Sequence, residues 1–332
     1  MRGDGELRPR EWMGPPGCLL LLHSWGLSFR MHWGIFVRPS AGIARLPASD
    51  GFNTTRDAGF EQLAVIATDK FVLLNYPRTG STFVRGCIRS VYGQAARPHG
   101  QLLSMLGLAA HFRELILPIE RTLTAQHEGR SSQHGTYSQI PARYQGLPVV
   151  SVARNPFDRE VSLFEHEFWR KTPPGDPAEI AARFPDFPEL SFAEFLQMQD
   201  EFGMRNVLKG VKLKANVGPE TVHFIRFFHP DPDEALERMS DRSVDNGEVL
   251  GELPAIHFLH TESLIEDLCE FLAGVGISRD RIQSLQDREP VNAARRRAGR
   301  PWHEYFTPEL KAEFRQRERL LFQRFPEYGE KA

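Results

Sequence analysis

A buried strand that leads directly into a glycine-containing turn and then a helix is the feature that most constrains the fold of this chain. Residues 70–75 are an apolar run with charge before it and Pro77 behind it, which is typical of a buried parallel strand. From Phe83 to Tyr92, apolar residues recur at helical spacing. The first amide groups of such a helix lack partners within the helix and carry a partial positive charge. The junction therefore predicts an anion site, with a purely structural strand–helix junction as the alternative.

The same order of elements returns later in the chain. Residues 147–153 form a second apolar run, followed by Arg154 and by a helix with Pro156 in its first turn, where proline is tolerated. A third strand is expected at 255–260. Strands that alternate with helices are typical of an α/β fold. We therefore expect a P-loop-like parallel β-sheet with helices on both faces.

Helix starts are marked at three further positions. Ser191 and Ser263 each begin a capping box, with a glutamate three residues later. Thr307 precedes a last amphipathic helix, which should stop before Pro326. The proline-rich segment 172–188 is expected to be an irregular surface segment.

The first residues of the chain differ in composition from the rest. The length of 332 residues permits one large domain, and we expect a single domain at 57–330 after an extension at 1–56. An apolar run begins at Cys18, but polar residues interrupt it and the flanking charges are balanced, which disfavours a secretory signal. We expect the extension to be disordered or to be translated from a non-native upstream start, with Met31 as another start. Membrane association through the apolar run is the alternative.

Composition excludes some classes of partner. Lys and Arg total 41 against 43 Asp and Glu, and this net charge of -2 does not fit a general nucleic-acid-binding protein. The three cysteines, Cys18, Cys87 and Cys269, match neither a zinc spacing nor a disulfide framework, so we expect a cytoplasmic protein. The sequence has no apolar run of about 18 residues, so it predicts no transmembrane helix. It carries no signal for an oligomeric state.

The turn at 76–82 is not a Walker A loop, because it lacks the lysine of GxxxxGK[ST]. Arg78 instead offers a planar fork of donors, which binds an oxyanion without a metal ion. The second junction adds Arg154 and, eight residues later, Ser162. Each motif follows the carboxyl end of a strand, where ligands of open α/β sheets bind. We expect two anion sites, with an ion pair between Arg154 and Asp158 as the alternative.

These motifs resemble the 5′-phosphosulfate loop and the 3′-phosphate motif of sulfotransferases that use 3′-phosphoadenosine-5′-phosphosulfate (PAPS). The first reads Arg78-Thr79-Gly80-Ser81-Thr82-Phe83, and the second reads Arg154-Asn155-Pro156 with Ser162. Arg78 and Phe83 stand where the small-phenol branch typically has Lys and Trp. The resemblance is therefore closer to the carbohydrate, Golgi-type branch, in a bacterial-like single-domain form, and it extends from about residue 68 to the C-terminus.

The resemblance implies a metal-independent PAPS site. Arg78 would act on the bridging oxygen, the turn would bind the 5′-phosphate, and Arg154 with Ser162 would bind the 3′-phosphate. The basic segment 291–300 would close over the nucleotide, with a solvated basic loop as the alternative. The residues expected to contact the donor are Arg78, Thr79, Gly80, Ser81, Thr82, Phe83, Arg154, Ser162, Arg295 and Arg297.

A base for the acceptor proton is expected between the two motifs, and histidine has a suitable unperturbed pKa. His134 lies 20 residues before Arg154, in a short segment that leads to the second strand. The chain is similar here to glycan 2-O-sulfotransferases, whose catalytic histidine stands about 20 residues before the 3′-phosphate arginine. We therefore predict His134 as the base and His127 as the second candidate. A loop histidine with a local hydrogen bond is the structural alternative.

Together these features predict a sulfotransferase that moves a sulfuryl group from PAPS to a hydroxyl or amine acceptor by in-line displacement. A glycan, a glycolipid and a small hydroxylated metabolite all fit as acceptors, because fold does not determine substrate. Two other functions stay open. One is a non-catalytic nucleotide-binding protein with a degenerate sulfotransferase fold. The other is a P-loop kinase or hydrolase, which needs a Walker lysine and an acid for Mg²⁺ that the sequence does not supply near the turn.

Overall fold

The computed structural model describes residues 65–107, 110–115, 117–118, 131–132, 134–286, 288 and 300–330. The expected extension at 1–56 and the candidates His127, Arg295 and Arg297 lie outside these residues. Within the described part of the chain, no helix combines the length and the apolar character needed to cross a bilayer.

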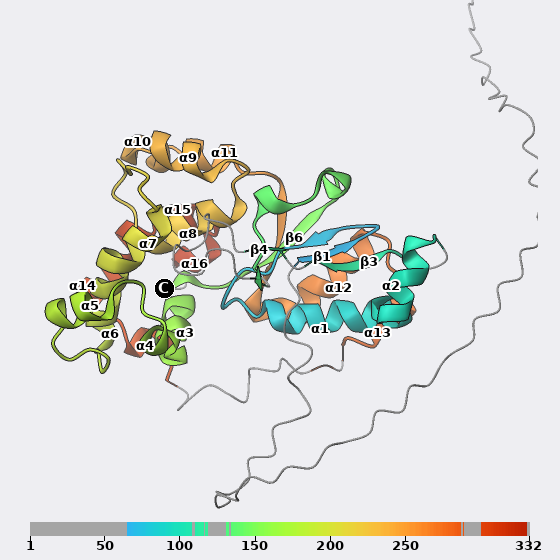
Figure 1. The fold of residues 1–332 in the computed structure, drawn as a ribbon, viewed down its shortest axis with the longest axis horizontal. Coiled ribbons are helices and arrows are strands. Elements are labelled where there is room, and N and C mark those ends of the chain that lie inside the picture. Colours follow the sequence, from blue (N-terminus) through green and yellow to red (C-terminus); the bar gives the residue numbers. More distant parts are fainter. Residues whose placement is uncertain are drawn as a thin grey trace, which may run out of the picture. The chain divides into compact units, whose positions relative to one another are not determined.

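Five strands form the central sheet, in the order β3–β1–β2–β6–β7 (Figure 1). Their bounds are β1 Val65–Thr68, β2 Val72–Leu73, β3 Phe112–Leu115, β6 Val149–Ala153 and β7 Ile256–His260. A separate short pair joins β4 Leu117–Pro118 to β5 Ser131–Ser132. The three strands expected from the sequence are therefore present as β2, β6 and β7, each shorter than the range expected for it.

The sheet is mixed, and the expectation of a parallel sheet is wrong for one edge. β2, β6 and β7 are parallel, whereas β1 runs antiparallel to both β2 and β3. Only residues 69–71 separate β1 from β2, and a link of that length permits a hairpin but not a parallel crossover. The Thr68 hydroxyl closes the hairpin, since it donates to the carbonyl of Phe71 and accepts from its amide, both at 2.9 Å.

The parallel strands bring their carboxyl ends to one edge of the sheet. Leu73 of β2 lies opposite Val150 of β6, and Ala153 at the end of β6 lies opposite His260 at the end of β7. The segments that follow these strands therefore meet at this edge, which is where the sequence places both anion motifs.

Helices cover both faces of the sheet, so the α/β class is confirmed (Figure 1). One face packs against α1 Ser81–Tyr92, α12 Leu264–Gly274 and α13 Arg279–Gln283. The other face packs against α8 Pro219–Phe228 and α15 Arg319–Arg324. The two-sided burial explains why all five residues of β6 are buried and why all of them except Ser151 are apolar.

A third apolar cluster joins helices that do not pack on the sheet. It involves α3 Pro156–His166, α5 Pro177–Arg183, α6 Phe192–Met198 and α14 Pro308–Arg317. Its centre is Phe157, whose ring stacks on Trp302 at 4.7 Å between centroids. The remaining helices are α2 Pro98–Met105, α4 Phe168–Lys171, α7 Met204–Leu208, α9 Pro232–Arg238, α10 Asp241–Asp245, α11 Glu248–Gly251 and α16 Glu327–Glu330.

The helix signals in the sequence are only partly confirmed. Ser191 forms the expected capping box at α6. Ser263 precedes α12 but does not cap it, because its hydroxyl donates to Asp267 Oδ1 at 2.9 Å instead. The segment 172–188 is not wholly irregular, since Asp176 caps α5 within it.

The expected last helix is interrupted at Glu318, between α14 and α15. The Glu318 carboxylate accepts hydrogen bonds from the amide of Glu220 and from the amide and hydroxyl of Thr221. These groups lie in the first turn of α8, where unpaired amides favour a negative charge. The break therefore places a buried carboxylate at the start of α8.

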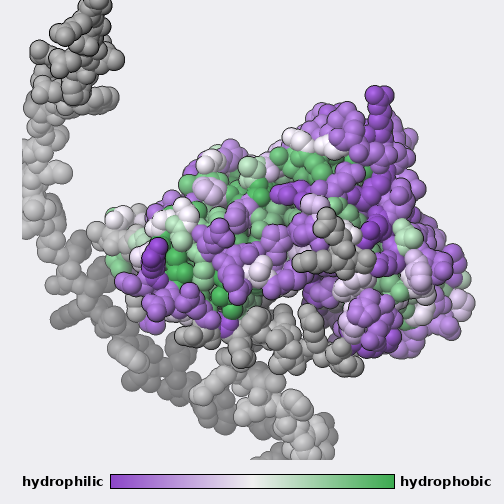
Figure 2. Space-filling view, turned by 180° about the vertical axis from the view of Figure 1, so that it is seen from behind, coloured by the Kyte–Doolittle hydropathy of each residue, from purple (hydrophilic) through white to green (hydrophobic). Residues whose placement is uncertain are grey.

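The surface is mostly hydrophilic where Figure 2 shows it, with smaller apolar areas between the hydrophilic ones. The large apolar side chains that are exposed in the described part of the chain are Leu102, Leu103, Leu106 and Phe168.

Candidate functional site

The turn between β2 and α1 has an unusual backbone. Arg78 and Gly80 both adopt left-handed conformations, with φ of 64° and 87°. Such a conformation is easy for glycine but strained for arginine. Gly80 is also the N-cap of α1, and no side chain caps this helix start. The amides at the start of α1 therefore receive no side-chain cap, and the binding of an anion there stays a prediction.

Hydroxyl groups hold the turn from the inside. Thr79 Oγ1 and Ser81 Oγ both donate to the carbonyl of Tyr76, at 2.9 and 3.1 Å, and both residues are buried. Thr82 is exposed, whereas Phe83 is buried in the core on the α1 face of the sheet. The structure thus places Ser81 and Phe83 as parts of the scaffold, and their contacts with a donor stay predictions.

Thr261, directly after β7, ties the turn to the other strands. Its hydroxyl lies 3.0 Å from the carbonyl of Thr79 and 2.8 Å from the carbonyl of Ala153. One side chain therefore connects the segments that follow all three parallel strands. No local pattern in the sequence marks Thr261, because its partners are distant in the chain.

The two motifs touch each other directly. Arg78 Nη2 donates to the hydroxyl and the carbonyl of Ser162, both at 3.0 Å. Arg154 Nη1 donates to the carbonyl of Arg78 at 3.0 Å. The ion pair that the sequence left as an alternative is also present, since Arg154 Nε lies 2.6 Å from Asp158 Oδ2. The ion pair and the contact between the motifs therefore coexist.

Arg78 differs from its two neighbouring arginines in its charge balance. Arg154 pairs with Asp158 and Arg159 pairs with Glu220, whereas Arg78 has no carboxylate partner among the residues that the structure describes. Its Nε atom is buried without an acceptor within the same residues. Burial, together with the charges of Arg154 and Arg159, lowers the pKa of Arg78 to about 10. Arg78 is thus charged at neutral pH, and a bound anion would stabilise it.

Arg159 is a buried cation that sequence analysis missed. Its Nε donates to the carbonyl of Pro77 at 3.0 Å, its Nη1 forms an ion pair with Glu220, and its guanidinium lies 4.5 Å from the centre of the Tyr76 ring. The signal in the sequence is an arginine on the buried stripe of α3, between the apolar residues Phe157 and Val161. A charge at such a position needs partners from other elements.

His134 lies at the same edge of the sheet, as predicted. Its Nδ1 is 2.8 Å from the carbonyl of Asn75. A carbonyl only accepts, so Nδ1 carries the proton and Nε2 is the basic nitrogen in the neutral ring. Burial lowers the pKa of His134, although the bond to Asn75 opposes this effect; the charges of Arg85 and Arg159 lower the pKa further. His134 is therefore neutral at pH 7, as a general base must be.

His223 of α8 is a second histidine near the site and was not predicted. Its ring stacks on Tyr76 at 5.4 Å, and its Nδ1 lies 3.5 Å from Arg159 Nη2. An arginine only donates, so Nδ1 accepts and the ring is neutral. In agreement, burial holds the pKa of His223 well below its usual range, with contributions from the charges of Arg159 and His134.

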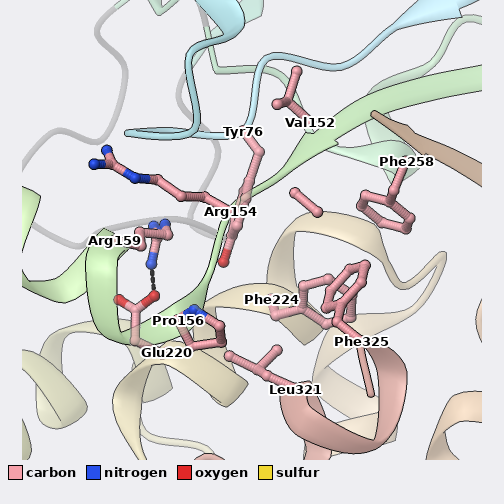
Figure 3. A pocket seen from close by; sticks show the side chains of 11 residues that line it. Tyr76, Val152, Arg154, Pro156, Arg159, Glu220, Phe224, Phe258, Leu321 and Phe325 are labelled. Carbon is pink, nitrogen blue, oxygen red and sulfur yellow. Dashed lines mark ion pairs between the residues drawn. The ribbon is translucent and has the colours of Figure 1, made fainter. Parts of the chain in front are cut away.

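A pocket of about 320 Å³, counting its part open to solvent, lies beside these groups. Figure 3 shows Arg154 and Arg159 on one side of Tyr76, and Phe224, Phe258 and other apolar side chains on the opposite side. Charge is therefore confined to one end of the pocket. Within the described residues, no group of three or more His, Cys, Asp or Glu side chains is arranged to hold a metal ion.

Comparisons with known proteins add little to this geometry. No protein-family model matches the chain, and no curated protein matches it in sequence. Among solved structures, the chain is similar to the mouse sulfotransferase SULT7A1 complexed with PAP, with 15% sequence identity and a TM-score of 0.36. The similarity covers 74% of this chain and 82% of that chain. A likeness of this strength carries no argument about function, which has to rest on the site itself.

Proposed function

We propose that the chain is a sulfotransferase, which transfers a sulfuryl group from PAPS to a hydroxyl or amine acceptor. The observation that carries this proposal is the state of Arg78. It is a half-buried cation without a carboxylate partner in the described residues, it lies beside the uncapped start of α1, and it contacts Ser162 of the second motif. A ligand with two separate phosphate groups would supply the negative charge that this arrangement lacks.

The residues present fit PAPS at both of its ends. The amides at the start of α1 and the half-buried guanidinium of Arg78 are suited to the 5′-phosphosulfate. Arg154 and Ser162 are suited to the 3′-phosphate, which distinguishes this donor from ATP. When bound, PAPS supplies a sulfuryl group on a phosphate leaving group.

The proposal gives His134 and Arg78 separate roles in the transfer step. His134 Nε2 would take the proton of the acceptor hydroxyl while the acceptor oxygen forms its bond to sulfur. The bond between sulfur and the bridging phosphate oxygen breaks, and its electron pair stays on that oxygen, where Arg78 would stabilise the charge. The products are the sulfated acceptor and 3′-phosphoadenosine 5′-phosphate (PAP), and His134 returns its proton to water.

We favour a carbohydrate hydroxyl as the acceptor, on the ground that Arg78 and Phe83 match the carbohydrate branch of the family. We also propose that the transfer is independent of metal ions, because the turn carries the guanidinium of Arg78 and lacks the lysine of a Walker A loop. A cytoplasmic location and a single domain at 57–330 belong to the same proposal.

The first experiment is a calorimetric titration with PAP, with ATP, and with ATP plus Mg²⁺. We expect micromolar binding of PAP without a metal ion and much weaker binding of ATP. Arg154→Ala should weaken PAP binding more than tenfold, since a charge-assisted contact is worth about 1.5–3 kcal/mol.

The matched control is Arg238→Ala. Like Arg154, Arg238 forms an ion pair with a carboxylate four residues away, in this case Glu234. Arg238 lies in α9. This variant should bind PAP as the unchanged protein does. A preference for ATP with Mg²⁺, or equal PAP affinity in the Arg154→Ala protein, would contradict the proposed function.

A further inference from the structure

We propose that Arg159 is a positioning residue, which fixes the turn between β2 and α1 in its ligand-binding form. The inference rests on the proposed function, because that function gives the turn its ligand. Its first support is the bond from Arg159 Nε to the carbonyl of Pro77, at 3.0 Å. Pro77 directly precedes Arg78, whose left-handed backbone needs support from its surroundings.

Arg159 is placed to connect three elements. It belongs to α3, it bonds the turn at Pro77, and it reaches Glu220 and His223 on α8. The planar guanidinium can serve these partners at once because its donors point in fixed and different directions. The arginine therefore couples the position of the turn to the two helices that flank it.

Burial argues against direct contact between Arg159 and a substrate. The residue is 4% exposed, and the Tyr76 ring lies against its guanidinium. Its effect on a ligand must therefore pass through the Pro77 carbonyl and through its positive charge. That charge lowers the pKa of Arg78 and of His134, although burial has the largest effect on both.

Arg226 shows what a purely structural arginine looks like in this protein. It is 1% exposed, it donates to the carbonyls of Val207 and Leu208, and it pairs with Asp233. It has the same kinds of partner as Arg159, but none of them belongs to the turn. It provides a matched control for the loss of a buried guanidinium.

The test compares Arg159→Met/Glu220→Gln with Arg226→Met/Asp233→Asn. Each double variant removes a guanidinium without leaving its carboxylate charged and unpaired. Two quantities are measured, the affinity for PAP by calorimetry and the pKa of His134 by NMR titration of its ring. We expect the first variant to bind PAP roughly tenfold more weakly and to show a raised pKa for His134, because a nearby positive charge is lost. The Arg226 variant should change neither quantity, even if its melting temperature falls.

Arg159→Lys sharpens the test, because lysine keeps the charge but lacks the planar fork. We expect it to leave the pKa of His134 close to that of the unchanged protein and to restore part of the affinity for PAP. Unchanged PAP affinity and an unchanged His134 pKa in Arg159→Met/Glu220→Gln would overturn the proposal. If the unchanged protein does not bind PAP, the proposed function fails instead, and the His134 titration alone then decides whether Arg159 acts on the site.

Discussion

The two strand–helix junctions of the site differ in how the unpaired amides at the start of the helix are capped. After β2, the chain turns through two left-handed residues, and α1 starts at Gly80 without a side-chain cap. After β6, α3 starts at Asn155, whose side chain accepts a hydrogen bond from the amide of Phe157 at 3.0 Å. The start of α1 therefore has no side-chain cap, whereas the start of α3 is capped by Asn155.

This difference determines which chemical groups each junction can offer to a ligand. The first can offer backbone amides to an anion, together with Arg78. The second offers side chains, because Asn155 has already satisfied part of its helix start, and Arg154 and Ser162 project from it. The sequence predicts two separate anion sites, the first made by backbone amides with Arg78 and the second by Arg154 and Ser162. The structure joins the two motifs through the contact between Arg78 and Ser162, and the binding of anions by either motif stays a prediction.

The largest effect is expected from His134, the proposed base, which contacts the carbonyl of Asn75 just before the first junction. His134→Ala should lower kcat by about 10²–10⁴-fold with little change in PAP affinity, because a general base acts on the acceptor and not on the donor. The assay is PAP release from PAPS in the presence of a panel of monosaccharides and phenols. Below pH 6.5, the unchanged protein should keep its activity until the pH reaches the lowered pKa of His134, where protonation removes the base.

His111→Ala is the control for this prediction. His111 is also half-buried with a lowered pKa caused by burial, and it contacts Tyr144 and Ser104 rather than the turn. Equal turnover in the His134→Ala and His111→Ala proteins, or an acidic midpoint above pH 6.5 in the unchanged protein, would remove His134 from the mechanism.

The next effect concerns the backbone of the first junction. Gly80→Ala places a side chain at a φ of 87°, which costs about 1–2 kcal/mol. We expect PAP affinity to fall about tenfold as the turn relaxes from its binding form, as measured by calorimetry. Gly247→Ala is a matched control, because Gly247 is also a left-handed N-cap, at φ 75°, and a Cβ there meets no atom within 4 Å. Both variants should lose similar stability, and equal PAP affinity in the two would show that the turn is not the binding element.

A smaller effect is expected from the contact that joins the junctions. Ser162→Ala removes the hydroxyl that accepts from Arg78, and PAP affinity should fall about threefold to tenfold. Ser90→Ala is its control. Ser90 lies in α1, and its hydroxyl accepts a hydrogen bond from Arg288 at 2.8 Å. If the two serine variants bind PAP equally well, the second junction does not contribute through Ser162.

The smallest effect on binding should come from the cap of the second junction. Asn155→Ala should lower the unfolding free energy by about 1 kcal/mol, through loss of the N-cap of α3, and leave PAP affinity within about twofold. Thermal unfolding and calorimetry measure the two quantities. Asp176→Ala, which removes the cap of α5, should cost similar stability. A large loss of affinity in Asn155→Ala alone would mean that this helix start also binds the ligand.

The residues of the candidate site that the sequence predicts belong to patterns of neighbouring residues in the chain. The turn at 77–82 and the Arg154-Asn155-Pro156 motif are each read from a strand, a turn residue and a helix start within about 15 residues. His134 was placed from its position just before β6, and it does reach the carbonyl of Asn75. Local patterns of this kind are sufficient to predict that these segments meet at one edge of the sheet.

The part that was missed depends on contacts between distant segments. Arg159 meets Glu220 and His223, and Glu318 interrupts the last helix to bind Thr221. Periodicity within one helix does not reveal such partners, because the buried charge and its neutralising group lie on different elements. The antiparallel β1 was missed for a related reason, since Val65–Thr68 is a strand only through its pairing with β2 and β3.

The bridge made by Thr261 has a consequence for how the protein is made. Its hydroxyl meets carbonyls that lie 182 and 108 residues earlier in the chain. During synthesis from the N-terminus, the segments that follow β2 and β6 emerge from the ribosome long before Thr261, which contacts both of them. Contacts of such high sequence separation form late and slowly. A nascent chain that ends before Thr261 therefore lacks this bridge, and we expect ligand binding to appear only in translation products that extend past β7.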